Sequence, residues 1–310
     1  MKYLISNKLY KETKLVHARF KIHGPCLSDD NYDLASCLKC EKWVSQAVPW
    51  INRPRSSWLS PESVHKIIMR GVLFETIGFK DSINEDLEWR ISFSVAEKLL
   101  IFVFNHTQLL CYALLKIFLK EILEKDKSLK GLLCSYYIKT LMFWISDDAN
   151  PTVWRPDNII PCFMACLQRL LYSVEYSTLL HYFIPSLNLF GLRLSTKVKQ
   201  KYTMTVLLAN LYDQGIQCFS VSETLCDYTR FSTTFNKQLN INSRLVHEVL
   251  RCIHMIRFSV RFSIRLDTVA QANSSNAPPP DFGSAKGCIA FTSTCRPINA
   301  ICKSASSYHL

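Results

Sequence analysis

In the N-terminal part of the chain, apolar and polar residues are spaced as in short β-strands. Short apolar runs that end at turn residues predict strands within residues 15–44, at Val72–Gly78 and at Trp89–Phe93. Between them, Ser60 followed by Pro61 has the composition of a helix N-cap and first turn. Because strands come first and helices follow, the pattern predicts an α+β fold rather than an alternating βαβ fold.

From residue 94 onward, apolar residues recur at helical spacing. Ser94 and Glu97 fit the capping box that begins a helix, and a long helix or a helix pair is expected to continue to about Lys125. Further helices are predicted at residues 129–146, 157–172, 177–182 and 197–213.

The last part of the chain has a different pattern. Residues 257–266 alternate strictly between apolar residues and Arg or Ser, which predicts a strand. Their arginines are also four positions apart, so a helix with a basic stripe is the alternative. Residues 271–288 are rich in Ser, Pro and Ala, which is typical of a flexible tail.

Charge adds a function class to this picture. The 310 residues include 37 Lys or Arg and 25 Asp or Glu, a net charge of +12, which favours a polyanionic partner. The 48% hydrophobic content excludes a fully disordered chain. A cluster of basic residues with interleaved tryptophans could bind nucleic-acid phosphates, or could be an ordinary solvated face. This basic–tryptophan cluster consists of Lys39, Lys42, Arg53, Arg55, Lys66 and Arg70 with Trp43, Trp50 and Trp58.

The cysteines indicate a reducing compartment. There are 13 of them, an odd number, and the first residues lack a signal-peptide pattern, so we expect free, mostly buried thiols in a cytoplasmic or nuclear protein. Cys37 and Cys40 form a lone CxxC, so no zinc is expected, and Cys162 and Cys166 fit a helical core. Residues 99–123 are interrupted by polar side chains, so no membrane-spanning segment is expected.

Five runs in order resemble one known family. They are Glu88–Glu97, Cys111–Lys116, Cys134–Thr140, Trp154 with Asn158–Leu167, and Leu179–Phe190. Together they resemble the male-abnormal-21 (Mab-21-like) family, which includes the cyclic GMP-AMP synthases and the cyclic GMP-AMP synthase-like receptors. The resemblance covers roughly residues 15–195.

The resemblance implies the end of a nucleotidyltransferase mixed sheet followed by a helical, helix-hairpin-helix-like C-terminal lobe. We therefore expect a remnant of the nucleotidyltransferase lobe at residues 1–93 and the helical lobe at 94–195. An unassigned basic region at 196–270 and a flexible tail at 271–310 would follow.

The resemblance also implies a metal site that this chain carries only in part. Family catalysis uses a Gly-Ser motif and three acids that hold two Mg²⁺ ions. No Gly-Ser motif with an acid-x-acid pair precedes residue 33, and only Asp33 matches, with an ordinary strand-edge acid as the alternative. Magnesium is expected only if a longer chain supplies the missing carboxylates. The interval from Glu97 to Cys111 is too short for the zinc-bearing insertion of some relatives.

By the same resemblance, several residues match nucleotide-contacting positions. These are Lys116, Ser135, Tyr136, Arg90, Ser92 and Glu97. The alternatives are a surface lysine, a helix serine bonded to its own backbone, a core tyrosine and, for Glu97, a capping role alone.

We therefore expect a protein that resembles the nucleotidyltransferase innate-immune receptors of this family. It would bind ATP, GTP or double-stranded nucleic acid without catalysing a reaction by itself. One alternative is a fragment of an active, nucleic-acid-sensing cyclic dinucleotide synthase. Another is a protein-interaction module whose cleft is vestigial.

Overall fold

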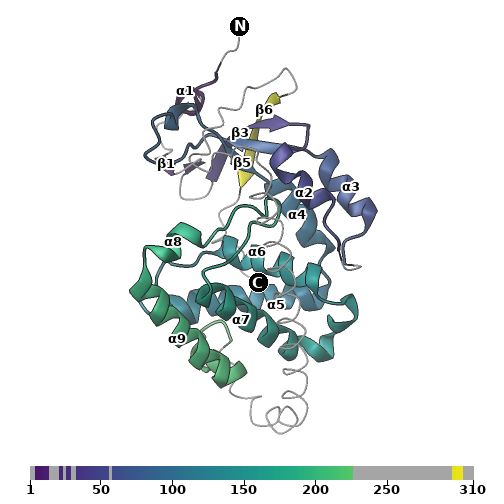
Figure 1. Cartoon of the computed structure of the whole chain (residues 1–310), viewed down its shortest axis with the longest axis vertical. Coiled ribbons are helices and arrows are strands. Elements are labelled where there is room, and N and C mark those ends of the chain that lie inside the picture. Colours follow the sequence, from purple (N-terminus) through teal and green to yellow (C-terminus); the bar gives the residue numbers. More distant parts are fainter. Residues whose placement is uncertain are drawn as a thin grey trace, which may run out of the picture. The chain divides into compact units, whose positions relative to one another are not determined.

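The computed structural model describes residues 4–13, 21–23, 26–28, 33–55, 58–225 and 295–302. These residues form two compact units. The sheet unit contains the described residues up to 51, residues 60–102 and residues 295–302; the helical unit contains residues 52–59 and 103–225. Figure 1 colours both units by position in the sequence.

The sheet unit is built on six strands. They are β1 (Lys21–His23), β2 (Cys26–Ser28), β3 (Asp33–Cys40), β4 (Val72–Glu75), β5 (Arg90–Ser92) and β6 (Cys295–Cys302). Every pairing among them is antiparallel, in the order β1-β2-β3-β4-β5. β6 pairs with all eight residues of β3, so β2 and β4 share the opposite edge of that strand. β3 is therefore the central strand of the sheet.

The strand predictions are confirmed at β4 and β5, and β1 to β3 lie within or next to the predicted 15–44 region. β6 lies inside the predicted tail, so residues 295–302 differ from that expectation. Its pairing with β3 has a sequence separation of more than 250 residues, which no local pattern reveals. The predicted strand at 257–266 lies outside the described residues.

Four helices belong to the sheet unit: α1 (Asn7–Glu12), α2 (Val48–Ile51), α3 (Pro61–Met69) and α4 (Ser94–Val103). The predicted N-cap is confirmed, because the Ser60 hydroxyl oxygen accepts a hydrogen bond from the Ser63 N–H at 3.1 Å. After α3, Gly71 has φ +66°, and a Cβ there would lie 2.0 Å from the carbonyl oxygen of Cys40. The turn into β4 therefore requires glycine.

The capping box falls elsewhere than predicted. The Glu97 N–H donates to the Phe93 carbonyl at 2.8 Å, so Phe93 takes the N-cap position and Ser94 is already inside α4. The capping box in the structure joins Asn105 and Gln108, which donate backbone N–H groups to each other's side chains at 2.8 and 3.0 Å. Of the two predicted alternatives, a long helix or a helix pair, the structure has the pair, with Asn105 between α4 and α5.

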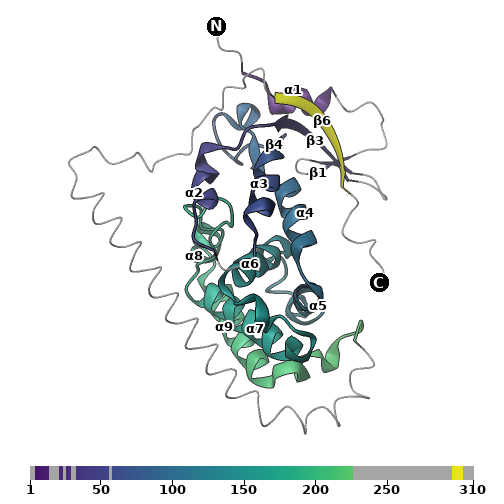
Figure 2. The same cartoon turned by 90° about the vertical axis from the view of Figure 1, so that its right-hand side faces the viewer.

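The helical unit contains five α-helices among its described residues. They are α5 (His106–Ile117), α6 (Ser135–Asp148), α7 (Ile159–Glu175), α8 (Gly191–Ser195) and α9 (Val198–Gln214). Shorter turns are a π-helical segment at Phe118–Ile122 and 3₁₀ segments at Leu123–Lys125, Pro151–Val153, Pro156–Asn158 and Gly215–Val221. α7 packs against α5, α6 and α9, as Figure 2 also shows, so it is the central helix of this unit.

The helix predicted at 177–182 is wrong. Leu180 instead pairs with Asn188 in an isolated antiparallel bridge. The Asn188 side chain accepts from the N–H groups of Leu179 and Phe190 at 3.0 and 3.1 Å and donates to the Ser177 carbonyl at 2.9 Å. These side-chain bonds satisfy the backbone in place of helical hydrogen bonds.

A sheet unit followed by a helical unit confirms the α+β fold class. α4 groups with the sheet, and α9 belongs to the helical unit although its residues fall in the region left unassigned by sequence. In the part of the chain that the structure describes, no helix has both the length and the apolar character needed to cross a membrane.

Candidate functional site

The N-terminal end of α6 presents two residues of the sequence-based hypothesis, Ser135 and Tyr136, together with Lys139. Ser135 is the first residue of this 14-residue helix and is exposed. Among the described residues, no side chain caps the helix end, which begins at Cys134. Lys139 lies one turn after Ser135, with its Nζ 5.4 Å from the centre of the Tyr136 ring. A hydroxyl, an aromatic ring and an ammonium group therefore gather at a positively polarised helix end.

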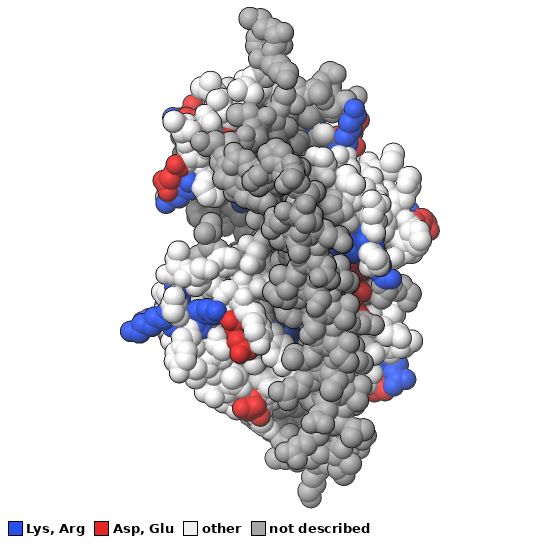
Figure 3. All heavy atoms as spheres, in the orientation of Figure 1, with Lys and Arg blue, Asp and Glu red and all other residues white. Residues whose placement is uncertain are grey.

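Arg193 of α8 contacts the same end of α6. Its guanidinium donates to the Gly131 carbonyl and to the Tyr137 hydroxyl, the latter at 3.4 Å. Figure 3 shows Lys and Arg side chains gathered over α8 and the start of α9, at the left of the view. The sequence pattern did not indicate Arg193, because only folding brings it to α6. It did not single out Lys139 either, although Lys139 is four positions after Ser135 and so lies on the same face of a helix. We call Ser135, Tyr136, Lys139 and Arg193 the α6 face.

A buried histidine supports Tyr136 from the neighbouring turn. The His181 ring lies 6.2 Å from the Tyr136 ring between centres and is 7% exposed. Its Nδ1 accepts hydrogen bonds from the N–H groups of Phe183 and Ile184 at 3.2 and 3.0 Å. Burial lowers the pKa of His181 to about 4, so the ring is neutral at pH 7 and acts as a turn-forming acceptor.

Lys116 lies on α5, which packs against α6. It is half-buried, and its Nζ is 5.8 Å from the centre of the Tyr112 ring one turn earlier. Its alkyl chain is therefore partly covered while the ammonium group is available to an anion, in keeping with a snorkelling lysine. A role in nucleotide contact stays a prediction for Lys116, as it does for Ser135 and Tyr136.

The other predicted residues lie in the sheet unit. Arg90 forms an ion pair with Glu75 across β4 and β5, with Nε and Oε2 2.8 Å apart. The Ser92 hydroxyl accepts a long hydrogen bond from the Ser94 N–H at 3.4 Å. Glu97 is buried, at 8% exposure. Arg90 and Ser92 thus have structural partners in the sheet unit, and Glu97 is buried there. For all three residues, contact with a nucleotide stays a prediction.

The magnesium expectation rests on Asp33, the first residue of β3. Its side chain lies outside the described residues, and its backbone pairs with Ser28 and Cys302. Among the described residues, no three His, Cys, Asp or Glu side chains are grouped so that they could hold a metal ion. The described side chains therefore do not fit the two-metal arrangement that the resemblance implies.

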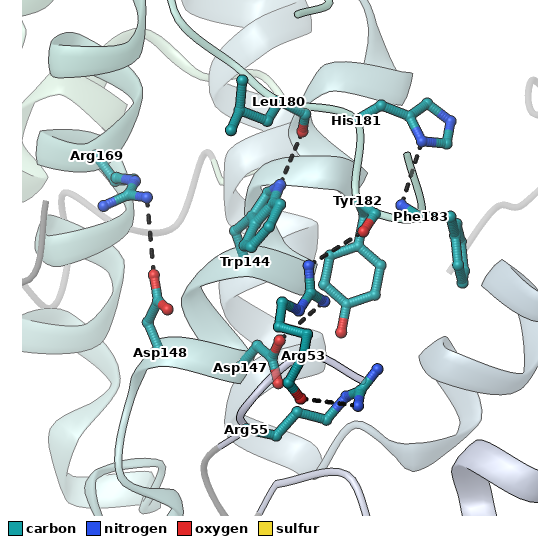
Figure 4. Close-up of polar contacts among 10 residues, drawn as sticks. All are labelled: Arg53, Arg55, Trp144, Asp147, Asp148, Arg169, Leu180, His181, Tyr182 and Phe183. Carbon is teal, nitrogen blue, oxygen red and sulfur yellow. Dashed lines mark hydrogen bonds and ion pairs between the residues drawn. The ribbon is translucent and has the colours of Figure 1, made fainter. Parts of the chain in front are cut away.

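Several members of the basic–tryptophan cluster predicted as a nucleic-acid surface are buried. Arg53 is 10% exposed and pairs with the buried carboxylate of Asp147 at 2.9 Å (Figure 4). Its guanidinium carbon lies 4.2 Å from the centre of the Trp144 ring and 4.4 Å from that of Tyr182, and it donates to the Tyr182 carbonyl at 3.2 Å. Arg53 is therefore the centre of a buried polar cluster, not a phosphate contact.

Four other members of that cluster differ in exposure and partners. Trp50 is fully buried and Trp58 is 9% exposed, so neither is available to stack on a base. The Arg55 guanidinium donates to the Arg53 carbonyl at 3.1 Å, and burial, together with the nearby Arg53 charge, lowers the pKa of Arg55. Lys66 forms an exposed ion pair with Glu62 at 2.6 Å.

The thiols are free and mostly buried in the described part of the chain, as predicted. Burial and the nearby Cys111 raise the pKa of Cys162 to about 12. The Cys166 sulfur lies 3.7 Å from the sulfur of Met142. Cys37 of the CxxC pair is buried and Cys40 is partly exposed. Protonated thiols of this kind act as core residues.

Comparison with known proteins assigns the helical unit to a class. Residues 108–208 match the Mab-21 protein HhH/H2TH-like domain. Over 129 residues the chain is 30% identical to the cyclic GMP-AMP synthase of Mus musculus, covering 37% of this chain and 25% of the relative. Over 131 residues it is 30% identical to that of Sus scrofa, covering 37% and 26%.

The matched domain contains nearly all of α5, the whole of α6, α7 and α8, and most of α9. Residues 108–208 of the chain therefore form a domain of the Mab-21 family. It spans about a quarter of the length of the curated relatives that it matches.

Proposed function

We propose that the helical unit binds the triphosphate of ATP or GTP on the α6 face. The observation that carries this proposal is the exposed N-terminal end of α6, which no described side chain caps: Ser135 begins the helix, Lys139 follows one turn later, and Arg193 donates to Gly131 and Tyr137. The names of the two relatives state that they make cyclic GMP-AMP, which supports a nucleotide as the ligand.

The chemistry of the α6 face suits a phosphate chain next to a base. Backbone N–H groups and the helix dipole favour an anion at a helix N-terminus. The Ser135 hydroxyl and the Lys139 ammonium can each donate to phosphate oxygens. Tyr136, half-buried against His181, can stack on a base because His181 holds its ring from behind.

We propose that this binding occurs without autonomous catalysis. The 310 residues contain no Gly-Ser motif with an acid-x-acid pair ahead of Asp33. Incubation of the purified chain with ATP, GTP, Mg²⁺ and double-stranded DNA or RNA tests this part. A cyclic dinucleotide product would contradict it and favour the active synthase. By analogy with its relatives, we propose an innate-immune role in the cytoplasm or nucleus.

The binding experiment is calorimetric titration of the full chain with ATP and with GTP. Lys139→Ala should weaken binding about tenfold or more, because hydrogen bonds to charged groups contribute about 1.5–3 kcal/mol, and Lys116→Ala tests whether the predicted lysine of α5 also contacts the nucleotide. Lys98→Ala is the matched control, since Lys98 also lies 5.8 Å from an aromatic ring, that of Phe102, but on α4. Binding unchanged in Lys139→Ala, or no binding by the wild type, refutes the proposal and leaves the interaction-module alternative.

Double-stranded nucleic acid is the second polyanion to test with the same variants. Phosphate contacts from Lys and Arg make binding fall steeply with salt concentration. The basic residues over α8 and the start of α9 are the natural footprint: Arg193, Lys197, Lys199 and Lys201. Loss of duplex binding in Lys197→Ala with Lys199→Ala, while ATP binding persists, would separate the two partners.

A further inference from the structure

A small cavity of about 220 Å³ lies between α7 and α9 in the helical unit. Six described residues line it: Gln168, Leu171 and Tyr172 of α7, and Ala209, Tyr212 and Asp213 of α9. The two helices pack against each other, and Figure 2 shows them side by side. Pockets for drug-sized ligands measure about 300–1,000 Å³, so this cavity suits a group the size of one side chain.

One wall of the cavity has an unused hydrogen-bond acceptor. Gln168 is 4% exposed, and its Oε1 has no hydrogen-bond partner among the described residues. A buried polar atom without a partner is destabilising, and a ligand that donates to it removes this cost. The cavity therefore favours an occupant with at least one N–H donor.

The remaining walls specify the charge of that occupant. The one ionisable acid that lines the cavity is Asp213, which is exposed at its rim. The rings of Tyr172 and Tyr212 complete the polar lining, and aromatic rings attract cations. An anion would be repelled by Asp213, whereas a cation meets a carboxylate, an amide oxygen and two aromatic rings.

We propose that this cavity, the α7–α9 pocket, binds a guanidinium group. A guanidinium is planar and carries five N–H donors in a fixed fork, so it can donate to Gln168 and Asp213 at once while its face lies against a tyrosine ring. An ammonium group matches the charge but lacks the flat shape. The α7–α9 pocket shares no residue with the α6 face, so this site stands or falls independently of nucleotide binding.

The first experiment is calorimetric titration of the full chain with n-butylguanidinium and with n-butylurea, its neutral isostere. The guanidinium compound should bind at least tenfold more tightly. The peptide acetyl-Gly-Arg-Gly-amide forms a third arm. Tighter binding of the peptide identifies the ligand as an arginine side chain of a polypeptide, and tighter binding of butylguanidinium identifies a free small guanidine. No binding in any arm, or equal affinity for butylurea, overturns the proposal.

Two variants tie the binding to the pocket. Asp213→Asn keeps the shape of an exposed side chain and should weaken butylguanidinium binding at least tenfold. Gln168→Leu removes the buried acceptor and should weaken it as well. The control is Asp157→Asn, an exposed aspartate of the same unit outside the pocket, which should bind as the wild type does. Unchanged affinity in Asp213→Asn would refute the assignment even if Gln168→Leu failed to fold.

Discussion

Replacing Arg53 by Met should strongly destabilise the helical unit. Met keeps much of the aliphatic stem but removes the guanidinium that lies against both Trp144 and Tyr182, whose ring centres are 4.2 and 4.4 Å from its carbon. The carboxylate of Asp147, whose side chain is 1% exposed, then loses its partner at 2.9 Å. Removing one member of a buried ion pair costs about 3–5 kcal/mol, so we expect a loss of that size in the free energy of unfolding.

The measurement is urea unfolding of the full chain, followed by tryptophan fluorescence and far-UV circular dichroism. Arg155→Met is the matched control, because Arg155 pairs with Asp157 at 3.0 Å in the same unit with side chains 63% and 66% exposed. An exposed pair contributes about 0–1 kcal/mol, so the two variants should differ by several kcal/mol although the distances nearly agree.

A double variant separates the ion pair from lost packing. In Arg53→Met with Asp147→Leu no buried charge of the pair remains, so the double variant should cost less than the sum of the two single variants by about 2 kcal/mol. If Arg53→Met costs no more than Arg155→Met, or if the single effects add, the buried pair does not hold the segment at residues 52–59 in the helical unit.

Three further outcomes are expected. His181 has a pKa of about 4 in the folded chain against about 6.5 in the unfolded chain, so the unfolded chain binds more protons as the pH falls. Stability that is present above pH 6.5 is therefore lost toward pH 4, by about 3 kcal/mol at most. His181→Asn should flatten this slope in unfolding experiments across that range. Gly71→Ala should lower the melting temperature of the chain far more than Gly131→Ala. Both glycines have positive φ, but only at Gly71 would the new Cβ meet a backbone atom, at 2.0 Å; similar melting temperatures for the two variants would contradict this. Native alkylation at pH 8 should label the partly exposed Cys134 much faster than Cys162, whose pKa burial raises to about 12; equal labelling by mass spectrometry would count against a buried thiol.

Much of the secondary structure could be predicted from the sequence because its signals are local. The start of α3 follows from Ser60 and Pro61, whose side chain and ring act within one turn. α7 and α9 follow from helical periodicity. The break at Asn105 carried an equally local signal, a polar cap with Gln108 three residues later, but it was hidden inside an apolar stretch.

The candidate site was predictable only in part. Ser135, Tyr136 and Lys116 lie on helices of the unit that matches the Mab-21 domain, as the resemblance implied. Arg193 could not be found, because it is 58 positions from Ser135 and reaches α6 only after α8 folds against it. Lys139 was within reach of spacing alone.

The sequence by itself determined most of the strands and helices, the cap at Ser60 and the resemblance to the Mab-21 family, because these depend on short runs of residues. Only the tertiary structure decided which charges are available. Arg53 and Lys139 are both basic residues that follow an aromatic residue by three positions in the sequence, yet one is buried against Asp147 and the other is partly exposed on the α6 face. Burial depends on contacts between distant segments, and the energy of a charge depends on burial, so no local pattern could distinguish the two.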